Sequence, residues 1–229
     1  MGRTQTSIAI ERLRSDIVSG RLRPGEKLRV VRLAEHIGVS ASALREALSR
    51  LVTDDLVEVE DQRGFRVSPV SRDDLLDLTE TRVGIECLAL TRAIEHGGVA
   101  WEAEIISACY RLSRCAAAAG GDGTPAASWS DLHREFHRSL IAACRSEWLL
   151  YFCSVLYEQT ERYRLLSMYR APSSREPLKE HEELMAVVIR RDTAAATGLI
   201  AAHFRETTRI ILASADGLDT SVPSSAGPD

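Results

Sequence analysis

Two histidines four positions apart are the first candidates for chemistry in this chain. In the segment "HREFHRSL", residues 133–140, His133 and His137 stand at i and i+4. On a helix that spacing places both imidazoles on one face, one turn apart. The pair is either half of a metal site or two ordinary helix residues, and the rest of the chain must decide between these alternatives.

Two further histidines lie in apolar helical patterns toward the C-terminus. His181 begins "HEELMAVVI", and His203 lies in "LIAAHFRETTRIIL". Burying several neutral imidazoles costs desolvation free energy unless each ring finds a partner. A shared metal ion would satisfy all four, and helical bundles build such sites from facing helices. We expect a divalent transition metal, zinc first and nickel as the alternative, on His133, His137, His181 and His203. The competing interpretation is a histidine-lined site without metal.

A metalloprotease motif is excluded by the spacing around the histidine pair. That chemistry needs HExxH, in which the glutamate directly after the first histidine is the general base. Here Arg134 follows His133, and Glu135 comes one place later, so it points away from the pair. No carboxylate at helical spacing from the four histidines suits a general base, which leaves a metal-dependent hydrolase as the remote alternative.

The N-terminal part has the pattern of a DNA-binding module. A helix over residues 6–19 ends at Gly20, and two short helices follow around the turn "IGVS", with Gly38 ending the first and Ser40 capping the helix 41–53. Next, "LVEVE" and "FRVSP" alternate apolar and polar residues around "DQRG", which predicts a β-hairpin. A helix-turn-helix followed by a hairpin is a winged helix.

Several polar and basic side chains cluster where such a module meets DNA. The recognition helix of a helix-turn-helix presents its N-terminal half to the major groove, and an arginine there can read guanine. We predict Arg45 as the residue that reads bases. The other predicted contacts, mainly to the sugar-phosphate chain, are Ser40, Ser42, Arg50, Arg63 and Gly64.

The remainder of the chain reads as helix broken by short loops. Helices are expected near 72–95, 99–118, 126–144, 147–170, 175–191 and 193–214. The fold class is therefore mainly α: a winged helix-turn-helix at 1–70, then an all-α bundle of about six helices at 71–214. A tail at 215–229, rich in Ser, Pro, Gly and Asp, is expected to be disordered.

Composition agrees with a DNA-binding protein outside the membrane. Residues 1–70 hold 12 Lys and Arg against 10 Asp and Glu, whereas the whole chain has a net charge of −4, so the N-terminal part is the relatively basic one. No apolar run is long enough for a membrane span, and no signal peptide is apparent, so we expect a cytoplasmic location. The five cysteines form no CxxC pair and are expected to be reduced thiols.

The N-terminal part resembles the GntR family of bacterial transcription regulators. The resemblance is carried by "PGEKLRVVRLAEHIGVSASALREALSRLVTDDLVEVEDQRGFRV". It implies a winged helix that binds palindromic operator DNA as a homodimer, with Arg45 as the base-reading arginine of "REAL" and Gly64 as the wing-tip glycine. Ala41 stands where the family usually has arginine after "GVS", which removes one possible contact.

The C-terminal part resembles the FCD effector domain of the FadR-like branch of that family. "ETRVGIECLALTRA", "LHREFHRSL", "EHEEL" and "AAHFRET" carry the resemblance over about 72–212. It implies three metal ligands at His137, His181 and His203, and a fourth at His133, where Asp or Asn is more usual. Asp131 is the fallback ligand, although its spacing from His137 is poor for one helix face.

The same resemblance implies a small carboxylate as effector. Arg82 and Glu86, one helical turn apart, match the family's pattern, and Arg82 can pair bidentately with a carboxylate. A salt bridge without a ligand is the alternative for this pair. Arg162, Tyr163 and Arg164 are weaker candidates for the same site.

These observations together predict a regulator and not an enzyme. The chain is expected to bind operator DNA, to sense a small carboxylate at a histidine-bound metal, and to repress transcription rather than activate it. The alternatives are the same regulator with a purely structural metal, and a metal-dependent hydrolase fused to a DNA-binding module.

Overall fold

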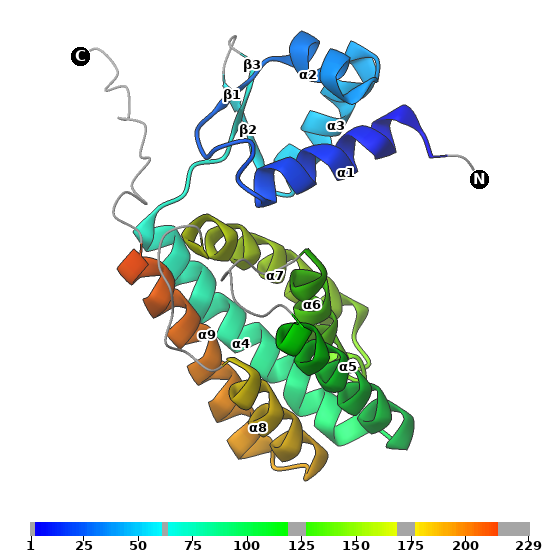
Figure 1. The fold of residues 1–229 in the computed structure, drawn as a ribbon, viewed down its shortest axis with the longest axis vertical. Coiled ribbons are helices and arrows are strands. Elements are labelled where there is room, and N and C mark those ends of the chain that lie inside the picture. Colours follow the sequence, from blue (N-terminus) through cyan, green and yellow to red (C-terminus); the bar gives the residue numbers. More distant parts are fainter. Residues whose placement is uncertain (1–2, 61–63, 119–126, 169–176, 215–229) are drawn as a thin grey trace. The chain divides into compact units, whose positions relative to one another are not determined.

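The chain divides into two compact units. The computed structural model describes residues 3–60, 64–118, 127–168 and 177–214, shown as coloured ribbon in Figure 1. The first unit takes its described residues from Met1–Leu75 and Glu161–Leu166, and the second takes them from Leu76–Thr160 and Ser167–Ser214. The tail that was expected to be disordered, 215–229, lies outside the described residues.

The first unit is a winged helix, as predicted. Its elements are α1 (Gln5–Val18), β1 (Lys27–Leu28), α2 (Val30–Ile37), α3 (Ala41–Thr53), β2 (Val57–Glu60) and β3 (Gly64–Val67). The strands form an antiparallel sheet in the order β1-β3-β2, with Glu60 opposite Gly64. Strand β1 pairs with β3, the second strand of the predicted hairpin. It has only two residues, too few to show an alternation of apolar and polar side chains in the sequence.

The turn between α2 and α3 is built as the sequence predicts. Gly38 has φ of 80°, a left-handed conformation that favours glycine, and its N–H donates to the Ala34 carbonyl at 2.9 Å. Ser40 then caps α3 by accepting a hydrogen bond from the Ala43 N–H at 3.2 Å. These two residues set the direction in which α3 leaves the turn.

An apolar core holds α3 in the first unit. Helix α3 packs on α1, and its buried residues recur at helical spacing. Sheet residues close the core from another side. Its buried members are Ala9, Leu13, Ile17, Leu28, Ala34, Leu44, Ala47, Leu48, Leu51, Leu56, Val57 and Val67.

The second unit is helical, in agreement with the predicted bundle. The helices are α4 (Arg72–His96), α5 (Val99–Ala118), α6 (Ala127–Ile141), α7 (Glu147–Met168), α8 (Pro177–Ile189) and α9 (Thr193–Ser214), of which α4 and α7 also contribute residues to the first unit. Helix α5 packs on α6 and α8, and α8 packs on α9. Figure 1 shows α4 and α9 side by side, where the hydroxyls of Thr79 and Thr208 lie 2.6 Å apart. Within the described residues, no helix is long and apolar enough to cross a membrane.

The connection between α4 and α5 is held by one aromatic side chain. Trp101 packs its ring against Gly97, and its indole N–H donates to the Ser139 carbonyl at 2.8 Å. Arg191 adds a hydrogen bond to the Gly97 carbonyl at 2.7 Å. A Cβ atom at Gly97 would overlap the Trp101 ring, whereas one at Gly98 would meet nothing within 4 Å. The close packing therefore requires glycine at position 97 and not at 98.

Gly97→Ala is expected to lower the free energy of unfolding by about 1–3 kcal/mol, the usual cost of overpacking a filled core. Thermal unfolding followed by circular dichroism measures the change. The matched control, Gly98→Ala, should stay within about 0.5 kcal/mol of the wild type. Equal stability of the two variants would contradict the packing of Trp101 on Gly97.

Candidate functional site

Helix α3 presents its predicted DNA-contacting residues on an exposed face. Arg45, Ser42 and Arg50 are exposed, while Leu44 and Leu48 of the same helix are buried. Arg45 forms no hydrogen bond or ion pair with any described residue. Arg50 is engaged at the surface by Glu46, at 2.6 Å. A guanidinium without an internal partner is available for an external acceptor.

The two serines at the start of α3 are not equivalent. The Ser40 hydroxyl caps the helix and lies 3.2 Å from the Ser42 hydroxyl, whereas Ser42 has no capping role. The side-chain amide oxygen of Gln5 accepts a hydrogen bond from the Ser40 N–H at 3.1 Å, so the first turn of α1 is tied to the first turn of α3. This contact of Gln5 was not predicted from the sequence.

The wing depends on a glycine conformation. Gly64 has φ of 101°, a region that residues with a Cβ rarely adopt, and it begins β3. The chain reverses there because Glu60 pairs with Gly64 across the hairpin. Arg63, the other residue predicted at the wing tip, lies outside the described residues.

The four predicted histidines converge at one place in the second unit. His133 and His137 come from α6, His181 from α8 and His203 from α9, and one ring nitrogen of each lies within 4.8 Å of the others. The four residues are 7, 2, 1 and 8% exposed, in chain order. The Nε2 atoms of His133 and His137 face each other at 3.2 Å. This histidine cluster can hold a metal ion.

Two members of the histidine cluster have their outer ring nitrogen bound by a neighbouring side chain. Nδ1 of His133 lies 3.0 Å from the Tyr157 hydroxyl, and Nδ1 of His203 lies 2.9 Å from a Glu180 carboxylate oxygen. The Glu180 carboxylate accepts a hydrogen bond from Nδ1–H of His203, which leaves Nε2 of that ring with its lone pair, the form that binds a metal. The Tyr157 hydroxyl, which can donate or accept, orients the His133 ring. Neither Tyr157 nor Glu180 was predicted from the sequence.

The packing around the histidine cluster is aromatic. Trp129 stacks on His133 with ring centroids 4.7 Å apart, and Phe136 contacts His181 at 5.1 Å. The fallback ligand Asp131 is exposed and does not belong to the group. Aromatic rings thus pack on His133 and His181.

A buried ion pair lies beside the histidine cluster. Arg82 and Glu86 of α4 are 5 and 2% exposed, and Nε of Arg82 donates to Glu86 at 2.5 Å. The guanidinium carbon is 3.9 Å from the ring centroid of Phe204, which in turn contacts His203 at 5.7 Å. The Nη2 atom of Arg82 is buried and has no hydrogen-bond partner among the described residues. Burial raises the pKa of Glu86, and Arg82 opposes that rise.

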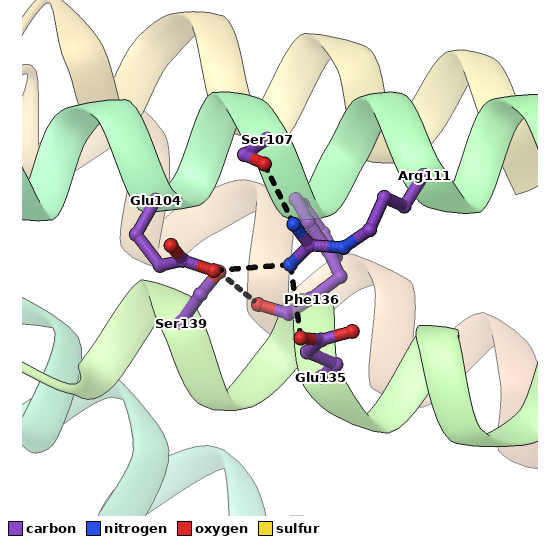
Figure 2. A network of polar contacts seen from close by, with 6 residues as sticks. All are labelled: Glu104, Ser107, Arg111, Glu135, Phe136 and Ser139. Carbon is purple, nitrogen blue, oxygen red and sulfur yellow. Dashed lines mark hydrogen bonds and ion pairs between the residues drawn. The ribbon is translucent and has the colours of Figure 1, made fainter.

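Glu135 lies between the two histidines of the pair in the sequence, but its carboxylate does not contact them. It forms an ion pair with Arg111 of α5, with 2.9 Å between the two charged groups. Figure 2 shows this contact as a dashed line. The same guanidinium contacts Glu104 at 3.0 Å and the Ser107 hydroxyl at 2.6 Å. Glu135 therefore joins α5 to α6 at the surface and does not act at the histidines.

Arg162 and Tyr163, the weaker candidates for the effector site, are placed with the first unit instead. Arg162 donates to the carbonyl groups of Ser68 and Pro69, and the Tyr163 hydroxyl donates to Asp74. These two side chains therefore contact the segment 68–74.

The cysteines form no disulfide among the described residues, and two of them have a strongly raised pKa. All five are in the reduced state, and Cys109, Cys144 and Cys153 are buried. Burial raises the pKa of Cys153 to about 12 and that of Cys109 to about 11. Because the thiolate is the metal ligand and the nucleophile, these two side chains are poor at both roles at neutral pH.

Two family matches cover most of the chain. Residues 5–67 match the bacterial regulatory proteins of the gntR family, and residues 77–206 match the FCD domain. The HTH-type transcriptional regulator BphR of Paraburkholderia xenovorans (strain LB400) is 38% identical over 210 residues, which cover 91% of this chain and 86% of that protein. The HTH-type transcriptional repressor GlaR of Escherichia coli (strain K12) is 35% identical over 195 residues, covering 83% and 88%.

Solved structures show the same fold. The structure of E. coli McbR/YncC superposes with a TM-score of 0.77 at 22% identity, covering 93% of this chain and 99% of that one. A GntR regulator from Rhodococcus sp. RHA1 gives a TM-score of 0.72, also at 22% identity, covering 93% and 100%.

Fold, exposed α3 face and matches together define a DNA-binding transcription regulator of the helix-turn-helix type. The chain belongs to the gntR family of bacterial regulatory proteins and carries the FCD domain of its FadR-like branch. Its relatives are regulators and not enzymes, so the prediction that the chain is no enzyme is confirmed and the hydrolase alternative is wrong.

Glu180→Gln tests whether the carboxylate supports metal binding by His203. Loss of the charged acceptor should lower zinc affinity about 10- to 100-fold, the usual effect of removing a partner behind a histidine ligand. Competition with a chromophoric chelator measures the affinity. Glu183→Gln, at an exposed position of the same helix, is the matched control and should bind zinc as the wild type does. Equal affinity of both variants would contradict the role of Glu180.

Proposed function

We propose that the protein is a ligand-responsive repressor that senses a small carboxylate at a metal ion held by His133, His137, His181 and His203. In this proposal residues 1–70 bind palindromic operator DNA, and residues 71–214 bind the effector and form the homodimer. The metal is zinc, with nickel as the alternative, and the protein acts in the cytoplasm. Repression is favoured because GlaR, a relative at 35% identity, bears the name of a repressor.

One observation carries the proposal: four buried imidazoles bring ring nitrogens within 4.8 Å of one another. The Nε2 atoms of His133 and His137 lie 3.2 Å apart, so two of these ligand atoms already face each other. A cation satisfies four lone pairs together, and imidazole nitrogen is a preferred ligand of zinc and nickel. The Tyr157 and Glu180 contacts orient two of the rings for this role.

The four-histidine ligand set also favours an anion as the effector. Four neutral imidazoles leave the charge of a divalent ion uncompensated, whereas an aspartate at the position of His133 would offset part of it. A carboxylate at an open coordination position would supply that charge. The buried Nη2 of Arg82 offers a hydrogen-bond donor beside the histidine cluster, which suits a carboxylate bound by both groups.

The regulatory mechanism follows from thermodynamic linkage. If effector binding changes the affinity for DNA by some factor, DNA binding must change the affinity for the effector by the same factor. For a homodimer on a palindromic site, the effector needs only to alter the relative positions of the two winged helices.

The central test combines metal analysis with a screen of acids. Purified protein should contain a transition metal at one ion per chain, by mass spectrometry. With zinc bound, acetate, succinate and citrate are screened for a rise in melting temperature; a ligand at 100 times its Kd adds about 2.7 kcal/mol. Arg82→Gln should abolish the response to the best acid while zinc still binds.

Arg205→Gln is the control for that experiment because Arg205 pairs with Glu80 at the exposed surface of α9. It should respond to acids as the wild type does. Zinc binding with no response to any acid in the wild type would leave the metal purely structural. Protein without a bound transition metal, and unable to take up zinc, would refute the metal site.

Arg45→Ala tests base recognition by α3. Duplexes selected from a random pool by the wild-type protein provide the specific site. The variant should lose about 1–3 kcal/mol for that site, the value of a bidentate contact to a base, and should keep its affinity for unselected duplexes. Gel retardation measures both affinities.

Arg50→Ala provides the contrast on the same helix. As a phosphate contact it should weaken binding to both kinds of duplex and reduce the slope of log affinity against log salt by about 1. Unchanged discrimination in Arg45→Ala would refute the assignment of base reading to Arg45.

A further inference from the structure

Helix α7 is an unbroken helix that contributes residues to both compact units. Its residues up to Thr160 lie in the second unit, and Glu161–Leu166 lie in the first. The two parts are covalently joined by unbroken helix. Residues 162 and 163 lie about 7.5 and 9 Å further along the helix axis than residue 157, so a shift of the helix at residue 157 can reach them.

Tyr157 ties this helix to the histidine cluster. It is 7% exposed, and its hydroxyl lies 3.0 Å from Nδ1 of His133. The guanidinium carbon of Arg82 lies 5.2 Å from the Tyr157 ring centroid, and that of Arg134 lies 5.1 Å from it. One side chain of α7 thus contacts a proposed metal ligand and the proposed carboxylate-binding arginine.

Arg162 forms hydrogen bonds with the segment between the wing and α4. Its side chain is 2% exposed, and Nη2 donates to the carbonyl of Ser68 and, at 3.3 Å, to that of Pro69. Both carbonyls belong to the segment 68–71 that directly follows β3. A buried guanidinium on two backbone carbonyls fixes the path of that segment.

Tyr163 holds the other end of the same segment. Its hydroxyl donates to the carboxylate of Asp74, in the first turn of α4, and accepts a hydrogen bond from the Ser71 N–H at 3.2 Å. The side chain is 1% exposed. Burial and the bond to Asp74 raise the pKa of Tyr163, so the hydroxyl keeps its proton and donates over the physiological range.

We propose that α7 transmits occupancy of the histidine cluster to the segment that leads from the wing into α4. In this inference, which rests on the proposed metal site, the ion fixes the His133 ring, the ring fixes Tyr157, and α7 carries that restraint to Arg162 and Tyr163. The regulated element is thus the backbone of residues 68–74, next to the DNA-binding module.

Hydrogen exchange on the full-length protein, with EDTA or with saturating zinc, tests this inference. The Ser71 amide reports the contact directly because it donates to Tyr163. In the wild type, zinc should slow exchange of the peptide covering residues 68–75 by about fivefold or more. Zinc binding is measured in parallel by chelator competition.

Two variants test whether α7 transmits the effect of zinc binding. Tyr157→Phe removes the hydroxyl at His133, and Tyr163→Phe removes the hydroxyl at Ser71 and Asp74. Both should bind zinc, Tyr157→Phe about tenfold more weakly and Tyr163→Phe as the wild type does. Each should lose the zinc-dependent part of the protection. Tyr151→Phe, at an exposed position of the same helix, is the control and should retain it.

The outcomes separate the two proposals. Failure of the wild type to bind zinc would refute the proposed metal site. Zinc binding that leaves exchange of residues 68–75 unchanged in the wild type would overturn the transmission by α7 alone. Full zinc-dependent protection of residues 68–75 in Tyr163→Phe would also overturn the transmission by α7. That result would show that zinc binding affects the segment by another path, such as α4. It would count even if Tyr157→Phe bound no zinc.

Discussion

The burial of four imidazoles in one helical unit is the constraint on which the rest of the structure depends. Each ring carries two nitrogens that cost free energy when they leave water without a partner. Three helices hold one ring nitrogen of each histidine within 4.8 Å of the others, and further side chains contact outer nitrogens. Tyr157 serves His133 and Glu180 serves His203. The cluster therefore fixes α6, α8 and α9 to one another and recruits α7 through Tyr157.

The DNA-binding unit must hold α3 in a defined orientation, and local backbone conformation and capping largely achieve this. A left-handed glycine ends α2, a serine caps α3, and a second positive-φ glycine turns the wing. An apolar core then orients α3 so that Arg45 stays exposed. This unit needs rigidity, because base reading depends on where one helix lies. The histidine cluster, by contrast, is built from segments far apart in sequence, which suits a site whose occupancy changes how those segments are held.

The difference between local and distant contacts also decides what could be predicted from the sequence. Helix periodicity and capping residues predicted the winged helix, the six later helices and the roles of Gly38 and Ser40, because those features are encoded within a few residues. The four histidines were predicted to converge because imidazoles on apolar faces need a shared partner. Glu180 and Tyr157 were missed, since a carboxylate or phenol on a helix has no sequence feature that marks it as a histidine's neighbour. The contacts of Arg162 and Tyr163 were missed for the same reason, because their partners lie about ninety residues away.

X-ray absorption spectroscopy of the zinc-loaded protein tests the four-imidazole site most directly. Its multiple-scattering features count imidazole ligands, and zinc–nitrogen distances lie at about 2.0–2.1 Å. A shared ion on His133, His137, His181 and His203 predicts four imidazoles around zinc, and three in a His133→Ala variant. Two or fewer imidazoles in the wild type, or a count unchanged by His133→Ala, would contradict a site in which His133 is a ligand.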